Sequence, residues 1–76
     1  MIDRIKEVIK RQVNIEVEIE EDVDLNVYGI DSLAKVHLLV ELEEVFGIEF
    51  EEDDINQDNF NNVMSIKNII SKYIEK

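Results

Sequence analysis

One segment of the 76-residue chain constrains the fold more than any other, and it runs from Ser32 to Phe46. Its apolar residues recur every three or four positions, which is the period of an α-helix. Asp31 directly before it suits an N-cap, because its carboxylate can accept a hydrogen bond from a free N–H of the first turn. Gly47 directly after it suits a C-cap. The pattern therefore predicts a helix whose two ends are both marked in the sequence.

Two further segments show the same helical spacing, one toward each end of the chain. Asn14 follows the first and suits a C-cap, and Asn62 precedes the second and suits an N-cap. The apolar residues predicted to share one face of the first helix are Ile2, Ile5, Val8, Ile9 and Val13. The buried stripe predicted for the second helix consists of Val63, Ile66, Ile69, Ile70, Tyr73 and Ile74.

The remaining segments predict loops. Residues 15–20 alternate like a β-strand, but no second alternating run exists to pair with them. We therefore expect residues 14–31 to form a long loop pinned by apolar residues such as Leu25. Residues 48–54 are expected to form an acidic loop, followed by a short third helix around Asp53–Gln57. The predicted fold is all-α, a small four-helix bundle of three main helices plus a short one, in a single domain over residues 1–76.

Composition excludes several classes of protein. The chain contains no cysteine, and His37 is its only histidine, which excludes disulfides, thiolate metal sites and multi-histidine zinc sites. The first residues are not followed by the apolar run of a signal peptide, and no stretch is long enough to span a bilayer. We expect a cytoplasmic, metal-independent monomer that does not insert into membranes.

The net charge of −11 is concentrated in the middle of the sequence, where residues 15–54 hold fifteen acids and one base, Lys35. Such a segment repels nucleic acid and anionic membranes and attracts basic protein surfaces. Solubility alone is the simpler explanation of the charge.

The predicted helix from Ser32 has more apolar surface than a core requires. At 100° per residue, one side gathers Leu38, Leu39, Leu42, Val45 and Phe46, which would meet Ile5, Ile9, Ile66 and Ile70. Leu33 and Val40 fall on nearly the opposite side, Val36 lies between the two faces, and His37, Glu41 and Glu44 surround the second side. Together these six residues form an apolar strip with polar neighbours. We expect this strip to dock a basic partner, the alternative being that loop residues cover Leu33 and Val40.

Ser32 follows a glycine turn in the motif Gly29-Ile30-Asp31-Ser32-Leu33. A serine hydrolase needs a base beside its nucleophile, and only His37 is available. On a helix the two side chains point about 140° apart, and the second glycine of G-x-S-x-G is missing. We therefore expect no catalytic residue and no enzyme activity in the chain itself.

Residues 22–26 begin like a calcium-binding loop. The loop then has Val27 where it needs a glycine and Leu33 where it needs a bidentate glutamate. The sequence therefore predicts no specific metal site, and only weak binding of divalent cations by the acidic cluster.

The chain resembles the acyl carrier protein family over nearly its whole length. The motifs that carry the resemblance are Leu25, Gly29-x-Asp31-Ser32-Leu33, Val36-x-Leu38-Leu39-x-Glu41-Leu42-Glu43-Glu44-x-Phe46-Gly47-Ile48 and Val63-x-Ser65-Ile66-x-x-Ile69-Ile70. The resemblance implies a carrier fold in which Ser32 bears a 4'-phosphopantetheine phosphodiester. It also implies that a separate transferase attaches this arm from coenzyme A with magnesium, that Asp31 helps to hold the transferase's metal, and that Leu33 is read by partners.

The arm would supply the thiol that this cysteine-free chain lacks, so that the cofactor does the chemistry and the protein positions it. The phosphodiester would lie at a helix N-terminus, where free N–H groups favour negative charge. Expected partners are the transferase, an acyl- or aminoacyl-loading enzyme, and a downstream synthase or transferase with a basic docking surface.

Some positions depart from fatty-acid carriers. Ala34, Lys35 and His37 stand where those carriers place acids, and Tyr28 and Ile30 replace a leucine and a small residue. These differences favour a discrete carrier of a polyketide, nonribosomal peptide or other specialised pathway over one of fatty-acid synthesis. The cargo could be an acyl or an aminoacyl group. The alternative from another class is an acidic adaptor that binds a basic partner and carries no arm.

Overall fold

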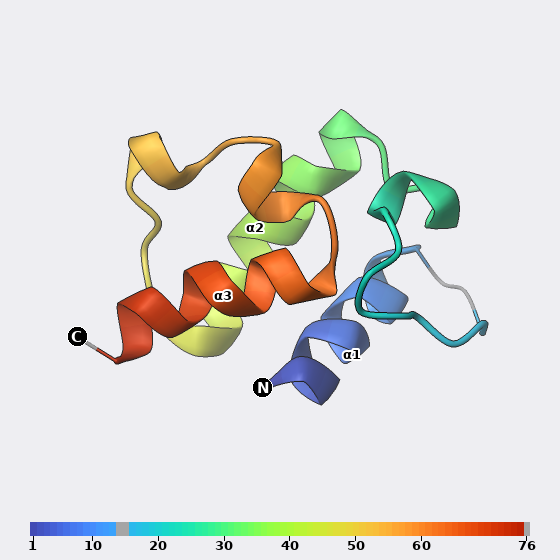
Figure 1. Ribbon diagram of the computed structural model, residues 1–76, viewed down its shortest axis with the longest axis horizontal. Coiled ribbons are helices and arrows are strands. Elements are labelled where there is room, and N and C mark those ends of the chain that lie inside the picture. The colour runs from blue at the N-terminus through green and yellow to red at the C-terminus, as the bar shows by residue number, and fades with distance from the viewer. Residues whose placement is uncertain (14–15, 76) are drawn as a thin grey trace.

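The computed structural model describes residues 1–13 and 16–75. It contains three α-helices, α1 (Ile2–Val13), α2 (Ser32–Phe46) and α3 (Val63–Ile74) (Figure 1). Three short 3₁₀ helices lie between them: η1 (Leu25–Tyr28), η2 (Glu52–Asp54) and η3 (Asp58–Phe60). The described residues form no strand, so the predicted all-α bundle is confirmed. The predicted C-cap at Asn14 lies outside the described residues.

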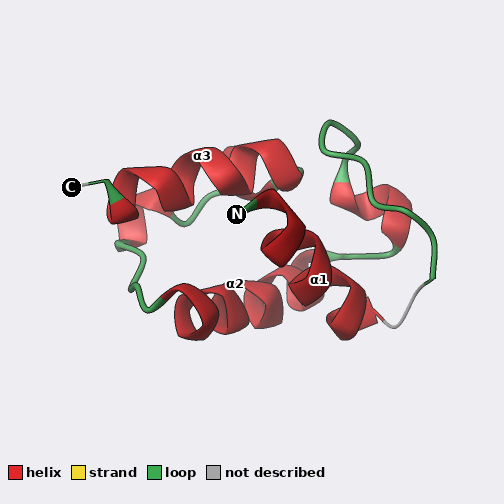
Figure 2. Ribbon diagram, turned by 90° about the horizontal axis from the view of Figure 1, so that it is seen from below, coloured by secondary structure: helices red, strands yellow, loops and turns green. Residues whose placement is uncertain are grey.

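α1 packs against both other helices and closes one end of the bundle. Figure 2 shows α2 and α3 on opposite sides of the molecule with α1 between them at that end. The core consists of the fully or almost fully buried Ile5, Val8, Ile9, Ile19, Leu25, Ile30, Leu38, Leu42, Phe50, Phe60, Val63, Ile66, Ile69 and Ile70. Leu39, Val45 and Phe46 are half-buried against this core, so the predicted inward side of α2 is confirmed.

Both helix starts that the sequence marked are capped as predicted. The Asp31 carboxylate accepts a hydrogen bond from the Ala34 N–H, and the Asn62 side chain accepts one from the Ser65 N–H. Gly47 ends α2 with a φ of 66°, in the left-handed region that favours glycine. For one residue of the stripe predicted to be buried on α3, Ile74, the prediction is wrong. Ile74 is 48% exposed, because it is the last residue of α3 and lies at the periphery of the bundle.

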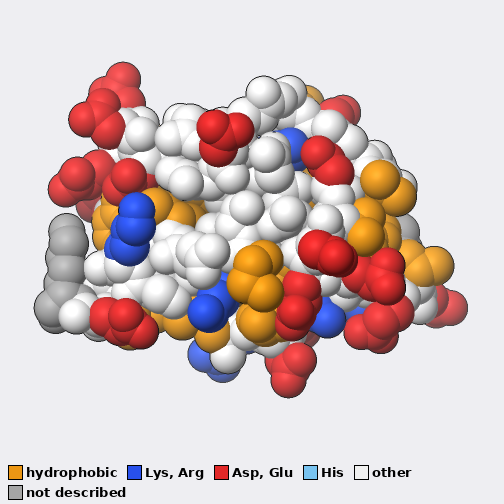
Figure 3. Space-filling model, in the orientation of Figure 1, with side chains coloured by type: hydrophobic (Ala, Val, Ile, Leu, Met, Phe, Trp, Pro, Cys, Tyr) orange, Lys and Arg blue, Asp and Glu red, His pale blue; other side chains and the backbone are white. Residues whose placement is uncertain are grey.

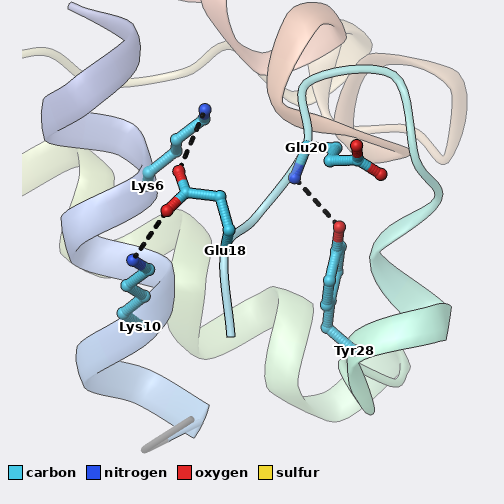
Figure 4. Close-up of polar contacts among 5 residues, drawn as sticks. All are labelled: Lys6, Lys10, Glu18, Glu20 and Tyr28. Carbon is cyan, nitrogen blue, oxygen red and sulfur yellow. Dashed lines mark hydrogen bonds and ion pairs between the residues drawn. The ribbon is translucent and has the colours of Figure 1, made fainter. Parts of the chain in front are cut away.

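The loop between α1 and α2 is held at several points, as its apolar residues predicted. Ile19 and Leu25 are fully buried, and the Leu25 N–H donates to the Asn61 carbonyl at 2.8 Å. The Glu18 carboxylate lies between the ammonium groups of Lys6 and Lys10, at 3.8 Å from each (Figure 4). These contacts bring the loop across α1 before it turns toward α2.

The connection from α2 to α3 differs from the prediction of a short α-helix around Asp53–Gln57. The chain instead makes two 3₁₀ turns, η2 and η3, on either side of residues 55–57. Asparagine side chains replace the helical hydrogen bonds here: Asn59 Nδ2 donates to the Asp54 carbonyl at 2.8 Å, and Asn56 Oδ1 accepts from the Asn59 N–H at 3.0 Å. Side-chain bonds of this kind compete with continuous helix.

An aromatic cluster attaches this connection to α3. Phe50 makes edge-on ring contacts with Phe60 and with Tyr73, with ring centroids 5.3 Å apart in both pairs. The Tyr73 hydroxyl accepts from the Glu51 N–H at 2.7 Å and donates to the Asp54 carboxylate at 2.5 Å. Tyr73 therefore holds the start of η2 against the bundle.

Candidate functional site

A tight turn delivers the chain to the candidate serine. η1 ends at Gly29, whose φ of 84° few other residues adopt without strain. Ile30 then enters the core, and its N–H donates to the Leu25 carbonyl at 3.2 Å. Ser32 follows as the first residue of α2 and is exposed. The turn and the buried Ile30 together fix the position of Ser32 on the surface.

The N-terminus of α2 is an open anion-binding end. The Asp31 side chain accepts a hydrogen bond from the Ala34 N–H at 2.9 Å, and the Asp31 carbonyl accepts one from the Lys35 N–H at 2.9 Å. Within the described part of the chain, the N–H groups of Ser32 and Leu33 have no hydrogen-bond partner. Free N–H groups and the helix dipole favour a negative group at this position. The residues present therefore fit a phosphodiester on Ser32, which is also accessible to an enzyme.

Two unusual residues before the serine have structural roles. The Tyr28 hydroxyl accepts a hydrogen bond from the Glu20 N–H at 2.9 Å (Figure 4), which joins η1 to the incoming loop. Ile30 fills the core below the turn. Tyr28 and Ile30 therefore both stabilise the turn that precedes Ser32.

Gln12 is a residue that the sequence did not single out. Its Nε2 donates to the Ala34 carbonyl at 2.8 Å, which joins α1 to the first turn of α2. Its Oε1 is buried and has no partner among the described residues. The two joined residues are 22 positions apart, so no local pattern marks this contact.

The strip on the outer side of α2 is exposed, as predicted. Leu33, Val36 and Val40 have 69%, 58% and 49% of their surface accessible, so no described loop residue covers them. His37 and Glu44 are exposed on the same side. Glu41 is half-buried and pairs with Arg11 of α1 at 3.5 Å. The docking role of these residues stays a prediction.

Charged and apolar side chains lie next to one another on one face of the molecule. Figure 3 shows many acidic side chains and few basic ones on the viewed face, with hydrophobic patches between them. Val27 of η1 adds a side chain that is 72% exposed, five residues before the serine, and the sequence analysis did not identify it.

An open groove of about 260 Å³ begins at Ser32 and was not predicted. One wall belongs to α2 and the other to the segment around η3. The lining residues are Ser32, Lys35, Val36, Leu39, Ile55, Asn56, Gln57 and Phe60. The groove is therefore lined by both apolar and polar side chains, directly beside the candidate attachment point.

The described residues contain neither a cluster of metal ligands nor a membrane-spanning helix. No three His, Asp or Glu side chains of residues 1–13 and 16–75 come together to hold a metal ion. None of the described helices is long and apolar enough to cross a membrane.

The fold and the exposed serine define a carrier domain, and the comparison with known families agrees. The family model of the phosphopantetheine attachment site matches residues 3–70. The chain belongs to this family, whose members carry a covalently attached 4'-phosphopantetheine.

The chain is also similar to individual carrier proteins. The aminoacyl carrier protein of Agrobacterium fabrum (strain C58 / ATCC 33970) is 30% identical over 57 residues, which are 75% of this chain and 69% of that protein. A solved structure of an engineered Bradyrhizobium japonicum glycine:[carrier protein] ligase, complexed with a carrier protein from Agrobacterium tumefaciens and AMP, contains a chain that is 27% identical, with a TM-score of 0.84. The match covers 93% of this chain and 99% of that one, so it is to the carrier protein.

The fold is also that of a holo acyl carrier protein from Nitrosomonas europaea, with a TM-score of 0.87 at 19% identity over 99% of this chain and 96% of that one. This likeness shows the fold alone.

Proposed function

We propose that this carrier protein holds an aminoacyl group as a thioester on a 4'-phosphopantetheine arm attached to Ser32. The observation that carries the attachment is the exposed Ser32 at the first position of α2, where two N–H groups are free. Support for an aminoacyl cargo comes from the similarity to an aminoacyl carrier protein and to a carrier in complex with a glycine-loading ligase.

Each part of the site has a role in this proposal. The arm supplies the thiol to which the cargo is bound. Asp31 caps α2 and lies next to the hydroxyl that the transferase modifies, where it helps to hold the transferase's metal. The protein itself has no catalytic residue and presents the cargo to enzymes that do the chemistry. The proposed location is the cytoplasm, where coenzyme A and ATP are available.

We further propose that the strip of Leu33, Val36, His37, Val40, Glu41 and Glu44 is the surface that partner enzymes contact. The partners are the phosphopantetheinyl transferase, the loading ligase and the enzyme that receives the cargo. Exposed apolar side chains next to the attachment point support this assignment, since a contiguous exposed apolar patch marks a protein interaction site.

Intact mass after incubation with coenzyme A, magnesium and a promiscuous transferase tests the attachment. We expect the wild-type chain to gain one phosphopantetheine, and Ser32→Ala to gain none. Ser65→Ala is a matched control, because Ser65 also lies in the first turn of a helix with a side-chain cap, and it should be modified like the wild type. The attachment proposal is wrong if the wild-type mass is unchanged under conditions that load another carrier.

A second experiment tests the cargo. The holo protein is offered ATP and amino acids with a glycine:[carrier protein] ligase, and in parallel ATP and fatty acids with an acyl carrier protein synthetase. We expect a mass increase from an amino acid and little or none from a fatty acid. Efficient loading with a fatty acid alone would contradict the aminoacyl part of the proposal and leave the attachment site intact.

A further inference from the structure

Lys35 is the single base among fifteen acids in residues 15–54. It lies three positions after Ser32 on α2, and both residues line the same groove. Side chains three apart on a helix are neighbours, with Cβ atoms about 5–6 Å apart. The ammonium group of Lys35 can therefore reach any group bonded to the Ser32 hydroxyl.

No carboxylate of residues 1–13 and 16–75 forms an ion pair with Lys35. The described residues form three ion pairs, and these use Lys6, Lys10 and Arg11. Lys35 takes part in none of them, although its sequence neighbourhood is strongly acidic. Its side chain is half-buried along the groove. A cation held in this way is available to an anion that arrives later.

We propose that Lys35 is a positioning residue that pairs with the phosphodiester on Ser32 and directs the arm along the groove. This inference rests on the proposed attachment at Ser32. The phosphodiester adds a negative charge to a chain of net charge −11, next to the carboxylate of Asp31. Lys35 and the free N–H groups of Ser32 and Leu33 are the nearby groups that offset this repulsion.

The groove beyond Lys35 matches the chemistry of the arm. A pantetheine chain alternates amide groups with short apolar stretches. The groove is lined by the side chain of Gln57, which carries an amide, and by Val36 and Leu39 of α2. An arm drawn toward Lys35 therefore enters the groove. Val36 belongs to both the groove and the outer strip, whereas Leu33 and Val40 do not line the groove and stay free for partners.

The test compares apo and holo forms of four proteins: wild type, Lys35→Met, Lys35→Arg and Lys72→Met. Methionine keeps the length of the side chain and removes the charge, and arginine restores the charge. Lys72 is an exposed lysine in the last turn of α3, outside the three ion pairs of the described residues, and serves as the control for net charge. Complete loading of each holo sample is verified by mass.

The readout is the difference in melting temperature between holo and apo forms of the same variant. In Lys35→Met at low salt, we expect this difference to be about 3 °C less favourable than in the wild type. Lys35→Arg and Lys72→Met should behave like the wild type. The deficit should shrink at about 1 M salt, because screening weakens the ion pair. Equal holo-minus-apo differences in Lys35→Met and the wild type would overturn the proposal.

A measurement on the wild type alone decides the question if the transferase does not load Lys35→Met. The side-chain ¹⁵N resonances of the lysines are compared before and after loading. We expect the Lys35 signal to move and the signals of Lys67 and Lys72 to stay in place. A Lys35 signal that does not move on a fully loaded chain overturns the inference and leaves the attachment proposal standing. A wild-type chain that is never loaded overturns both.

Discussion

The side-chain amide of Gln12 in α1 donates a hydrogen bond of 2.8 Å to the carbonyl of Ala34, two residues after the candidate attachment serine. The helix that presents Ser32 is therefore joined at its first turn to the helix that begins the chain. The other end of this amide, Oε1, is buried without a partner among the described residues. The contact thus combines a favourable bond with an unsatisfied group.

This geometry predicts different effects for two substitutions of Gln12. Gln12→Glu should destabilise the protein by at least about 2 kcal/mol near neutral pH, because a carboxylate can only accept and would face the Ala34 carbonyl. Gln12→Leu should change the free energy of unfolding by less than about 1 kcal/mol, because the lost bond is offset by removal of the unsatisfied oxygen. Urea unfolding measures both. Equal losses in the two variants would contradict the contact.

The two sides of α2 predict opposite outcomes for two aspartate substitutions. Val40→Asp should leave the fold intact, with a cost within about 0.5 kcal/mol, because Val40 is 49% exposed. It should still weaken transfer to or from the loading enzyme. Leu42→Asp should unfold the domain, because Leu42 is fully buried and an unpaired charge there costs more than a small domain can spare. Circular dichroism and a loading assay separate the cases, and a Val40→Asp variant that folds and loads normally would remove Val40 from the docking surface.

Reversing the charge at Glu44 should slow association with a basic partner. Glu44 is exposed on the outer strip of α2, and attraction between opposite charges mainly raises the association rate. The slowing in Glu44→Lys should fade as salt is added. Glu75→Lys makes the same charge change at the C-terminal end of α3 and should have little effect. Stopped-flow or surface-binding kinetics measure the association rates. Equal slowing in both variants would show that the net charge of the protein, and not a local contact of Glu44, sets the association rate.

Salt should raise the melting temperature of the apo protein. Fifteen acids against one base in residues 15–54 repel one another in the folded state. Raising NaCl from about 0.01 M to about 1 M shortens the Debye length from about 30 Å to about 3 Å and screens this repulsion. Calorimetry at several salt concentrations measures the change, and a melting temperature that stays flat or falls would show that the acids are not a source of strain.

Tyr73 predicts a loss of stability at alkaline pH. Partial burial, followed by the hydrogen bond to Asp54, raises the pKa of Tyr73 above its usual value of 10.0. The folded state therefore holds this proton more tightly than the unfolded state. The resulting stability is fully present below pH 10 and is lost as the pH rises through the higher pKa of the folded state. Tyr73→Phe should be less stable at neutral pH and should lose less on going to high pH.

The measurement is the melting temperature of both proteins across the alkaline range. The two proteins differ by this one hydroxyl, so the difference between their curves isolates the contribution of Tyr73. Parallel curves for wild type and Tyr73→Phe would contradict this prediction, because they would show that ionisation of the Tyr73 hydroxyl does not change the stability of the fold.

The sequence by itself determined the parts of this protein that depend on near neighbours in the chain. The caps Asp31 and Asn62 and the stop at Gly47 act within one helical turn, so their side chains predict where α2 and α3 begin and where α2 ends. The two sides of α2 follow from the helical period alone, and the burial of Leu42 beside the exposure of Val40 confirms them. The motif around Ser32 is equally local.

Only the tertiary structure decided the features that join residues distant in sequence. The Gln12–Ala34 bond, the Tyr73 contacts with Asp54 and the groove between Lys35 and Gln57 each need two segments brought together by the shared core. A periodic pattern shows that a residue faces inward, but not which residue lies opposite it. Burial also depends on where neighbouring elements end, which is why Ile74 continues the apolar stripe of α3 in sequence and yet is exposed in the folded protein.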